Sequence, residues 1–148
     1  MRQHAPRVFA VLIGLTALAV LLQGLWAGLF LPKKGDAAEG WVEVHARGGE
    51  IALALAVLAT LVGFVWIRAR RDLWVGSAVA VVLLAVEGWL GGEISDGGKS
   101  SLTAVHVPLA MALMALVTWL SFRSARQRSL GDDETADLRG ERATAARG

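Results

Sequence analysis

Four long apolar segments separated by short polar ones dominate the pattern of the chain. The first runs from Val8 to Leu31 without a formal charge and ends at a loop that contains Pro32 and Gly35. The other three cover residues 42–67, 73–91 and 102–122, with an arginine-rich turn and a Gly/Ser loop between them. A helix needs roughly 20 apolar residues to cross the hydrocarbon core of a bilayer. The pattern therefore predicts four membrane-spanning helices.

These spans predict an all-α fold, an integral membrane four-helix bundle over residues 1–122. Residues 123–148 are charged and poor in apolar side chains, so we expect a disordered, charged cytoplasmic tail. A cleaved secretory signal is the alternative interpretation of the first span. Its apolar core is too long for a signal, and no A-x-A site follows it.

The composition agrees with this class. The chain is 55% hydrophobic and 19% charged, whereas an average soluble domain is about 25% charged. Four spans leave no soluble domain of useful size, so the formal net charge of +2 is not evidence for a nucleic-acid partner. The chain has no cysteine, which excludes disulfides, thiolate metal sites and covalent C-x-x-C-H haem attachment.

Lysine and arginine predict the orientation. Residues 1–7, the turn at residues 68–72 and the start of the tail contain most of the basic residues: Arg2, Arg7, Arg68, Arg70, Arg71, Arg123, Arg126 and Arg128. The other two loops hold only Lys33, Lys34 and Lys99. By the positive-inside rule, this predicts a multi-pass protein of the cytoplasmic membrane with both termini in the cytoplasm. His45 and His106 then lie at matched depth below the outer surface, because spans two and four both begin there.

A short pattern occurs twice. Residues 23–28, QGLWAG, and 87–92, EGWLGG, each read polar-Gly-x-x-x-Gly with a Trp inside, and each is followed by Val-His at the start of the next span. The repeat predicts two tandem helical hairpins. Small-xxx-small spacing brings helix backbones close in lipid, so we expect Gly24/Gly28 and Gly88/Gly92 to pack against other helices.

The polar residues inside the spans need a reason to be there. Glu87 is the most costly of them, because an ionisable group in a membrane normally faces the bundle interior or water. The interpretations are a structural role, with the carboxyl group either protonated or paired with Arg47, and a working role. Gln23 is expected to make interhelical hydrogen bonds. Glu50 is expected to pair with Arg47, which is also spaced to pair with Glu43.

The two histidines suggest a cofactor. On a helix His45 shares a face with Gly49, Ala52 and Ala56, a strip of small residues against which a flat macrocycle can lie. Two imidazoles at matched depth on alternate helices of a bundle can hold haem iron from both sides. In that hypothesis His45 and His106 are the metal ligands, and Arg47 pairs with the propionates. Two interfacial histidines without a ligand are the alternative. Zinc fits less well because no third and fourth ligands are evident beyond Glu43 or Glu87.

The layout resembles one four-helix half of haem A synthase, over residues 8–122, through the histidines near the outer ends of spans two and four. That resemblance implies His45 and His106 as haem ligands. It implies no oxygenase activity, because only one half is present and Glu43 stands two residues before His45 where the family has three. The chain also resembles a group of small four-span bacterial membrane proteins of uncharacterised function with the same Q-G…H, E-G…H layout.

The sequence thus predicts a membrane protein that binds haem b between spans two and four, for electron transfer or haem handling. The alternative is a structural or accessory subunit without a cofactor, and proton handling through Glu87 ranks third. No catalytic residue is predicted, and the expected function is not enzymatic. The expected partners are the lipid bilayer and other membrane protein subunits, with no nucleic acid.

Overall fold

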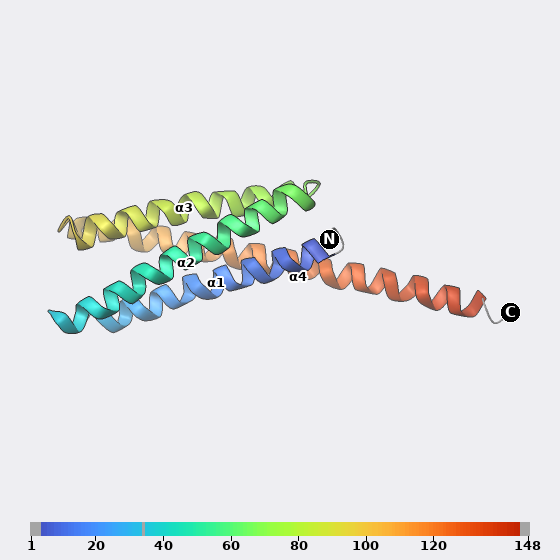
Figure 1. Ribbon diagram of the computed structural model, residues 1–148, viewed down its shortest axis with the longest axis horizontal. Coiled ribbons are helices and arrows are strands. Elements are labelled where there is room, and N and C mark those ends of the chain that lie inside the picture. Colours follow the sequence, from blue (N-terminus) through green and yellow to red (C-terminus); the bar gives the residue numbers. More distant parts are fainter. Residues whose placement is uncertain (1–3, 34, 146–148) are drawn as a thin grey trace.

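The protein is a bundle of long helices. The computed structural model describes residues 4–33 and 35–145, with side chains described as far as Arg126. Figure 1 shows helix α1 (Ala5–Phe30), α2 (Asp36–Trp66), α3 (Arg71–Ser95) and α4 (Thr103–Ala145), with a short 3-10 turn at Ser100–Leu102 before α4. The predicted all-α fold is confirmed. Each of the four helices is longer than the apolar segment that predicted it, and α1 is also shifted toward the N-terminus.

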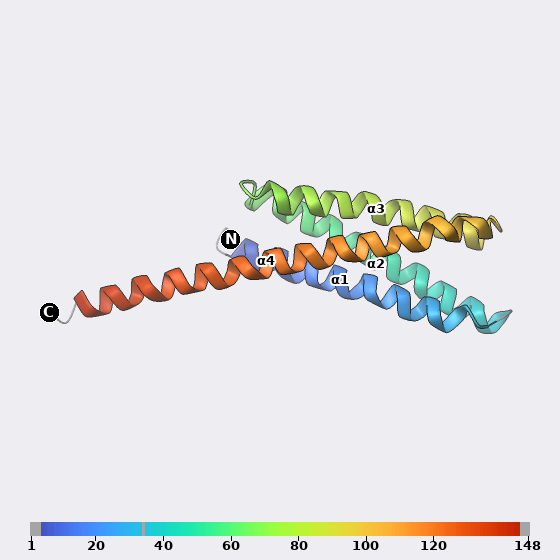
Figure 2. The same cartoon turned by 180° about the vertical axis from the view of Figure 1, so that it is seen from behind.

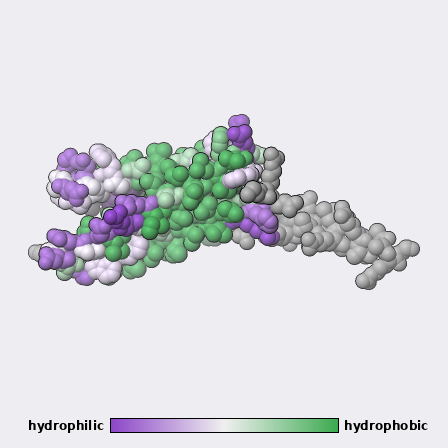
Figure 3. Space-filling view, viewed as in Figure 1, coloured by the Kyte–Doolittle hydropathy of each residue, from purple (hydrophilic) through white to green (hydrophobic). Residues whose placement is uncertain are grey.

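All four helices are long and apolar enough to cross a membrane, over Ala5–Phe30, Asp36–Trp66, Arg71–Ser95 and Ser100–Arg126. Large apolar side chains stand exposed along their outer faces, as a hydrocarbon environment requires. On the face seen in Figure 3 they form an apolar belt across the middle of the bundle, with polar groups gathered at the ends. Length, composition and this surface support the prediction of an integral membrane protein.

The helices form a ring in which each contacts its two neighbours: α1 with α2, α2 with α3, α3 with α4, and α4 with α1. Helices α2 and α4 therefore stand diagonally across the bundle. Residues 31–33, 35 and 96–102 lie at the same end of the bundle, which we call the loop end. The start of α1 and residues 67–70 lie at the other, the arginine end (Figures 1 and 2). At the loop end the hairpin α1–α2 diverges from the hairpin α3–α4.

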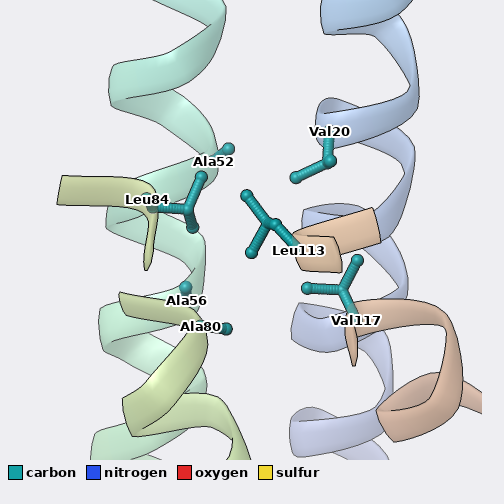
Figure 4. Packing of buried hydrophobic residues seen from close by; sticks show 7 residues of the cluster. All are labelled: Val20, Ala52, Ala56, Ala80, Leu84, Leu113 and Val117. Carbon is teal, nitrogen blue, oxygen red and sulfur yellow. The ribbon is translucent and has the colours of Figure 1, made fainter. Parts of the chain in front are cut away.

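The core takes side chains from every helix. Figure 4 shows the larger of two apolar clusters, which consists of Val20, Ala52, Ala56, Ala80, Leu84, Leu113 and Val117. A second cluster lies toward the arginine end and consists of Phe9, Ile13, Ala59, Leu73 and Leu120. The buried face of α2 is made only of small residues, Gly48, Ala52, Ala56, Ala59 and Gly63. Their regular spacing lets the neighbouring helices approach closely, which is how helices associate without a hydrophobic driving force in lipid.

The repeated glycines do not take part in this packing, so the expectation about them was wrong. A Cβ atom added to Gly24, Gly28, Gly88 or Gly92 would meet nothing within 4 Å. The close approaches occur instead at Gly63, where a Cβ would lie 2.8 Å from Cβ of Trp74, and at Gly76, 2.8 Å from Leu120 Cδ2. The spacing motif identifies glycines on a common face, but the direction of that face depends on how the helix is rotated in the bundle.

The two loop-end connections each contain one glycine in the left-handed region, Gly35 with φ 58° and Gly98 with φ 65°, a conformation that side-chain-bearing residues rarely adopt. Pro108 lies inside α4, close enough to its start at Thr103 that the helix continues through it. Helix α4 runs past the last apolar segment and away from the bundle to Ala145 (Figure 1). The predicted disordered tail lies mostly in residues 127–148, outside the residues whose side chains are described.

Candidate functional site

His45 and His106 meet across the diagonal of the bundle. Their ring centres are 6.4 Å apart, and the ring planes make an angle of 61°. The two side chains come from helices that are not neighbours, so they reach each other through the interior. The predicted matched depth of the two histidines is therefore confirmed.

The depth of the site follows from helix length. Glu87 and His106 lie about 22–26 Å of helix rise from the charged residues at the arginine end, at 1.5 Å per residue. A hydrocarbon core is about 30 Å thick. Glu87 and His106, and with them the adjacent His45, thus lie toward the loop end of the apolar belt. Figure 3 shows the hairpin ends there as two separate polar lobes.

Gln23 of α1 holds His45. The Nδ1 atom of His45 is 3.2 Å from the backbone carbonyl oxygen of Gln23, which can only accept a hydrogen bond. With its amide oriented to satisfy its neighbours, the Gln23 side chain donates to the His45 carbonyl at 2.8 Å and accepts from the Gly49 N–H at 3.2 Å. In this orientation its amide nitrogen also lies 3.1 Å from Nδ1, a contact that suits the other tautomer of the ring. The interhelical role expected of Gln23 is confirmed.

Aromatic side chains complete the surroundings of His45. The ring of Phe30 meets the imidazole edge-on, with ring centres 5.5 Å apart. Trp26 lies against α2 at Gly48, where an added Cβ would overlap the indole. The end of α1 therefore forms an apolar wall beside the ring.

Glu87 of α3 contacts His106. Its Oε2 atom is 2.5 Å from Nδ1 of His106, and the two side chains are 9% and 20% exposed. The atoms are close but not aligned as a hydrogen bond, and both Glu87 oxygens and this Nδ1 have no other hydrogen-bonding partner among the described residues. The ring of His106 lies over Gly91, where its Cε1 would be 3.9 Å from an added Cβ.

The two hairpins are therefore built alike at this site. In each, the polar residue near the end of the first helix contacts the histidine near the start of the second: Gln23 with His45, and Glu87 with His106. This correspondence supports the tandem-hairpin repeat predicted from the sequence. It also explains the buried Glu87, whose neighbour is an imidazole rather than the guanidinium of Arg47.

Arg47 lies elsewhere. Its Nε donates to Glu43 at 3.0 Å and its Nη1 to Glu50 at 3.0 Å, and all three side chains are about two-thirds exposed. The predicted pairing of this triplet along one face of α2 is confirmed. Arg47 has no contact with the histidines among those the structure describes, and its role toward a propionate stays a prediction.

The small-residue strip below His45 serves helix packing. Ala52 and Ala56 are fully buried in the core cluster that includes Val20 and Leu84. Gly49, one turn below His45, has no atom within 4 Å of the position of an added Cβ. The strip below that turn is therefore occupied by neighbouring helices, and the role of Gly49 in binding stays a prediction.

The donor set at this site consists of two imidazoles with one carboxylate behind them. Within residues 4–33 and 35–126, no group of three or more His, Cys, Asp or Glu side chains is placed to hold a metal ion. A site with two donors suits a metal whose remaining positions are supplied by another ligand, as a porphyrin supplies them in haem.

Fold and site together define the class: an integral membrane four-helix bundle with a histidine pair between diagonal helices. Comparison with known protein families, with characterised proteins and with solved structures finds no match to this chain. The geometry of the site is therefore what indicates a function for this chain.

Sequence reasoning missed two neighbours of the histidines, Phe30 beside His45 and Gly91 beside His106, and it missed the close approach of Trp26 to Gly48. It also named Arg47 as a partner for Glu87, whereas the contact is with His106. A signal for the correct one was present, because the repeat places one polar residue and one histidine in each hairpin, which favours contact within the hairpin.

Proposed function

We propose that this chain is a membrane-embedded haem b protein in which Nε2 of His45 and Nε2 of His106 bind the iron from opposite sides, for electron transfer or haem handling. The observation that carries the proposal is the 6.4 Å separation of the two ring centres across the bundle. A bound haem supplies a one-electron couple, and the protein contributes its ligands, its burial and its orientation.

The separation matches two imidazoles that share one metal. Metal–imidazole nitrogen bonds of about 2.0–2.1 Å, the range for zinc, place two opposed nitrogens about 4 Å apart and their ring centres on the order of 6 Å apart. The histidine pair has this spacing without any rearrangement of the helices.

The other ring nitrogens support the same assignment. Histidines that bind metals usually donate their second ring N–H to a carboxylate or a backbone carbonyl, which fixes the tautomer and the ring orientation. Nδ1 of His45 faces the Gln23 carbonyl oxygen, and Nδ1 of His106 faces the Glu87 carboxyl group. Nε2 of each ring is then the nitrogen left for the iron.

The membrane setting follows from the charges. Because the arginine end carries most of the basic residues, the positive-inside rule places it in the cytoplasm and the histidine pair near the outer leaflet of the cytoplasmic membrane. The resemblance of the sequence to one half of haem A synthase stays a prediction. If it holds, this chain has one haem site where that family has two.

The test is a reduced-minus-oxidised visible spectrum of the protein purified in detergent after expression with ample haem. We expect the bands of a six-coordinate b-type haem, and we expect His45→Ala and His106→Ala each to abolish or shift them. The third histidine offers a matched control: His4 is exposed near the start of α1, so His4→Ala should leave the spectrum unchanged.

If the wild-type protein binds no haem under these conditions, the haem proposal is wrong. The alternative of an accessory subunit without a cofactor then remains. Normal bands in both His45→Ala and His106→Ala would show that haem binds elsewhere on the chain.

A further inference from the structure

The two histidines have different groups behind them. His45 faces a neutral backbone carbonyl and a neutral amide of Gln23, whereas His106 faces the carboxyl group of Glu87. We propose that Glu87 is a positioning residue that, by accepting from Nδ1 of His106, makes this imidazole the stronger iron ligand and biases the site toward ferric haem. This inference rests on the proposed haem function.

The contact with His106 is the only polar contact that the structure shows for the Glu87 side chain among the described residues. Its side chain is 9% exposed, and its Oε2 is 2.5 Å from Nδ1 of His106. Neither oxygen has a hydrogen-bonding partner among the described residues. A buried carboxyl group without partners costs free energy, so its presence beside a histidine in a membrane helix requires a compensating interaction. An aligned bond from the imidazole N–H provides one.

The effect on the iron follows from the strength of Glu87 as a hydrogen-bond acceptor for the His106 imidazole. A carboxylate accepts a stronger hydrogen bond than an amide or a peptide carbonyl, and outer-shell acceptors of this kind raise the basicity of a metal-bound imidazole. A more basic ligand stabilises ferric iron more than ferrous iron.

The experiment is a redox titration of haem-loaded Glu87→Gln beside the wild-type protein in the same detergent and at the same pH. Removal of outer-shell partners typically changes metal affinity by 10–100-fold. We expect the ratio of ferric to ferrous haem affinity to fall about tenfold in Glu87→Gln, which raises the midpoint potential by 59 mV for a one-electron couple.

The same helix offers the matched control. Glu93→Gln removes another carboxyl group of α3, one that pairs with Lys99 rather than with a histidine, so the potential should stay close to that of the wild type. A Glu87→Gln potential equal to the wild-type value would overturn the proposal, as would a shift in Glu93→Gln as large as that in Glu87→Gln. A nonspecific effect of removing a carboxyl group from α3 predicts the second of these results.

A second variant covers the case in which Glu87→Gln fails to accumulate. Glu87→Asp keeps the carboxyl group but withdraws it by one methylene, and we expect a smaller rise in potential. An unchanged or lowered potential would contradict the proposal. The failures are distinguishable, because wild-type protein without haem bands overturns the haem function itself, whereas bands with an unmoved potential overturn only the role of Glu87.

Discussion

At the scale of single residues, the closest packing in the loop-end half occurs at Gly48. This residue is buried on α2, and a Cβ there would overlap the indole of Trp26 and the amide of Gln23. The same contact keeps Gln23 within reach of His45. The absence of a side chain at Gly48 is therefore a condition both for the approach of α1 to α2 and for the geometry behind the histidine.

We predict that Gly48→Ala destabilises the bundle, because Trp26 and Gln23 must move to admit the methyl group. Overpacking of this kind typically costs about 1–3 kcal/mol. The adjacent Gly49 is the control, since a Cβ there meets nothing within 4 Å. Gly49→Ala should be neutral or stabilise by about 0.5–1 kcal/mol through the better helix propensity of alanine. Thermal unfolding in detergent measures both, and equal midpoints for the two variants would contradict this account.

At the scale of elements, an ion-pair network adds to the apolar cluster at the arginine end. Asp72, at the start of α3, accepts from Arg70 Nε at 3.0 Å and Nη2 at 2.7 Å, and Arg123 Nε of α4 donates to it at 3.1 Å. The Asp72 side chain is 30% exposed and that of Arg123 is 52% exposed. One carboxylate thus connects the turn between α2 and α3 to the last apolar turn of α4.

We predict that Asp72→Asn weakens the attachment of α4 to α3, with a measurable coupling between Asp72 and Arg123. Partly exposed ion pairs contribute about 0.2–1 kcal/mol, so the double-mutant cycle Asp72→Asn/Arg123→Gln should return a coupling in this range. The measurement is reversible unfolding in mixed detergent micelles.

The Glu43–Arg47 pair provides the comparison for this cycle. It lies within one helix and is about two-thirds exposed, so the cycle Glu43→Gln/Arg47→Gln should give a smaller coupling. A coupling of zero for Asp72 with Arg123 would show that the network contributes nothing to the docking of α4.

At the scale of the whole molecule, the loop end and the arginine end must lie on opposite sides of a membrane, because the apolar belt separates them (Figure 3). The absence of native cysteine makes this directly measurable, since each introduced cysteine is the sole reactive thiol.

We predict that Ser100→Cys reacts with a membrane-impermeant maleimide in intact cells, whereas Ala69→Cys reacts only after the membrane is opened. Both positions are exposed, Ser100 at the loop end and Ala69 in the turn between α2 and α3. The expected result places the arginine end in the cytoplasm, as the positive-inside rule requires. The reverse pattern of labelling would place the histidine pair near the inner leaflet.

Several features could be predicted from the sequence because they depend on local physics. Runs of about 20 apolar residues must form helices in a bilayer, where each backbone polar group needs an internal partner. The pairing of Glu43, Arg47 and Glu50 follows from helix spacing alone. The equal depth of His45 and His106 follows from the order and lengths of the spans.

Other features were decided by the tertiary structure, because they depend on the rotation of each helix about its axis. That rotation turned Gly24 and Gly88 outward and Gly48 inward. It brought Glu87 to His106 rather than to Arg47. The charge pattern predicted which ends lie together, but only the ring arrangement of the helices determined that the two histidines face each other across a diagonal at 6.4 Å. A one-dimensional pattern gives the depth of a side chain in the membrane, whereas its partners depend on packing between helices far apart in the chain.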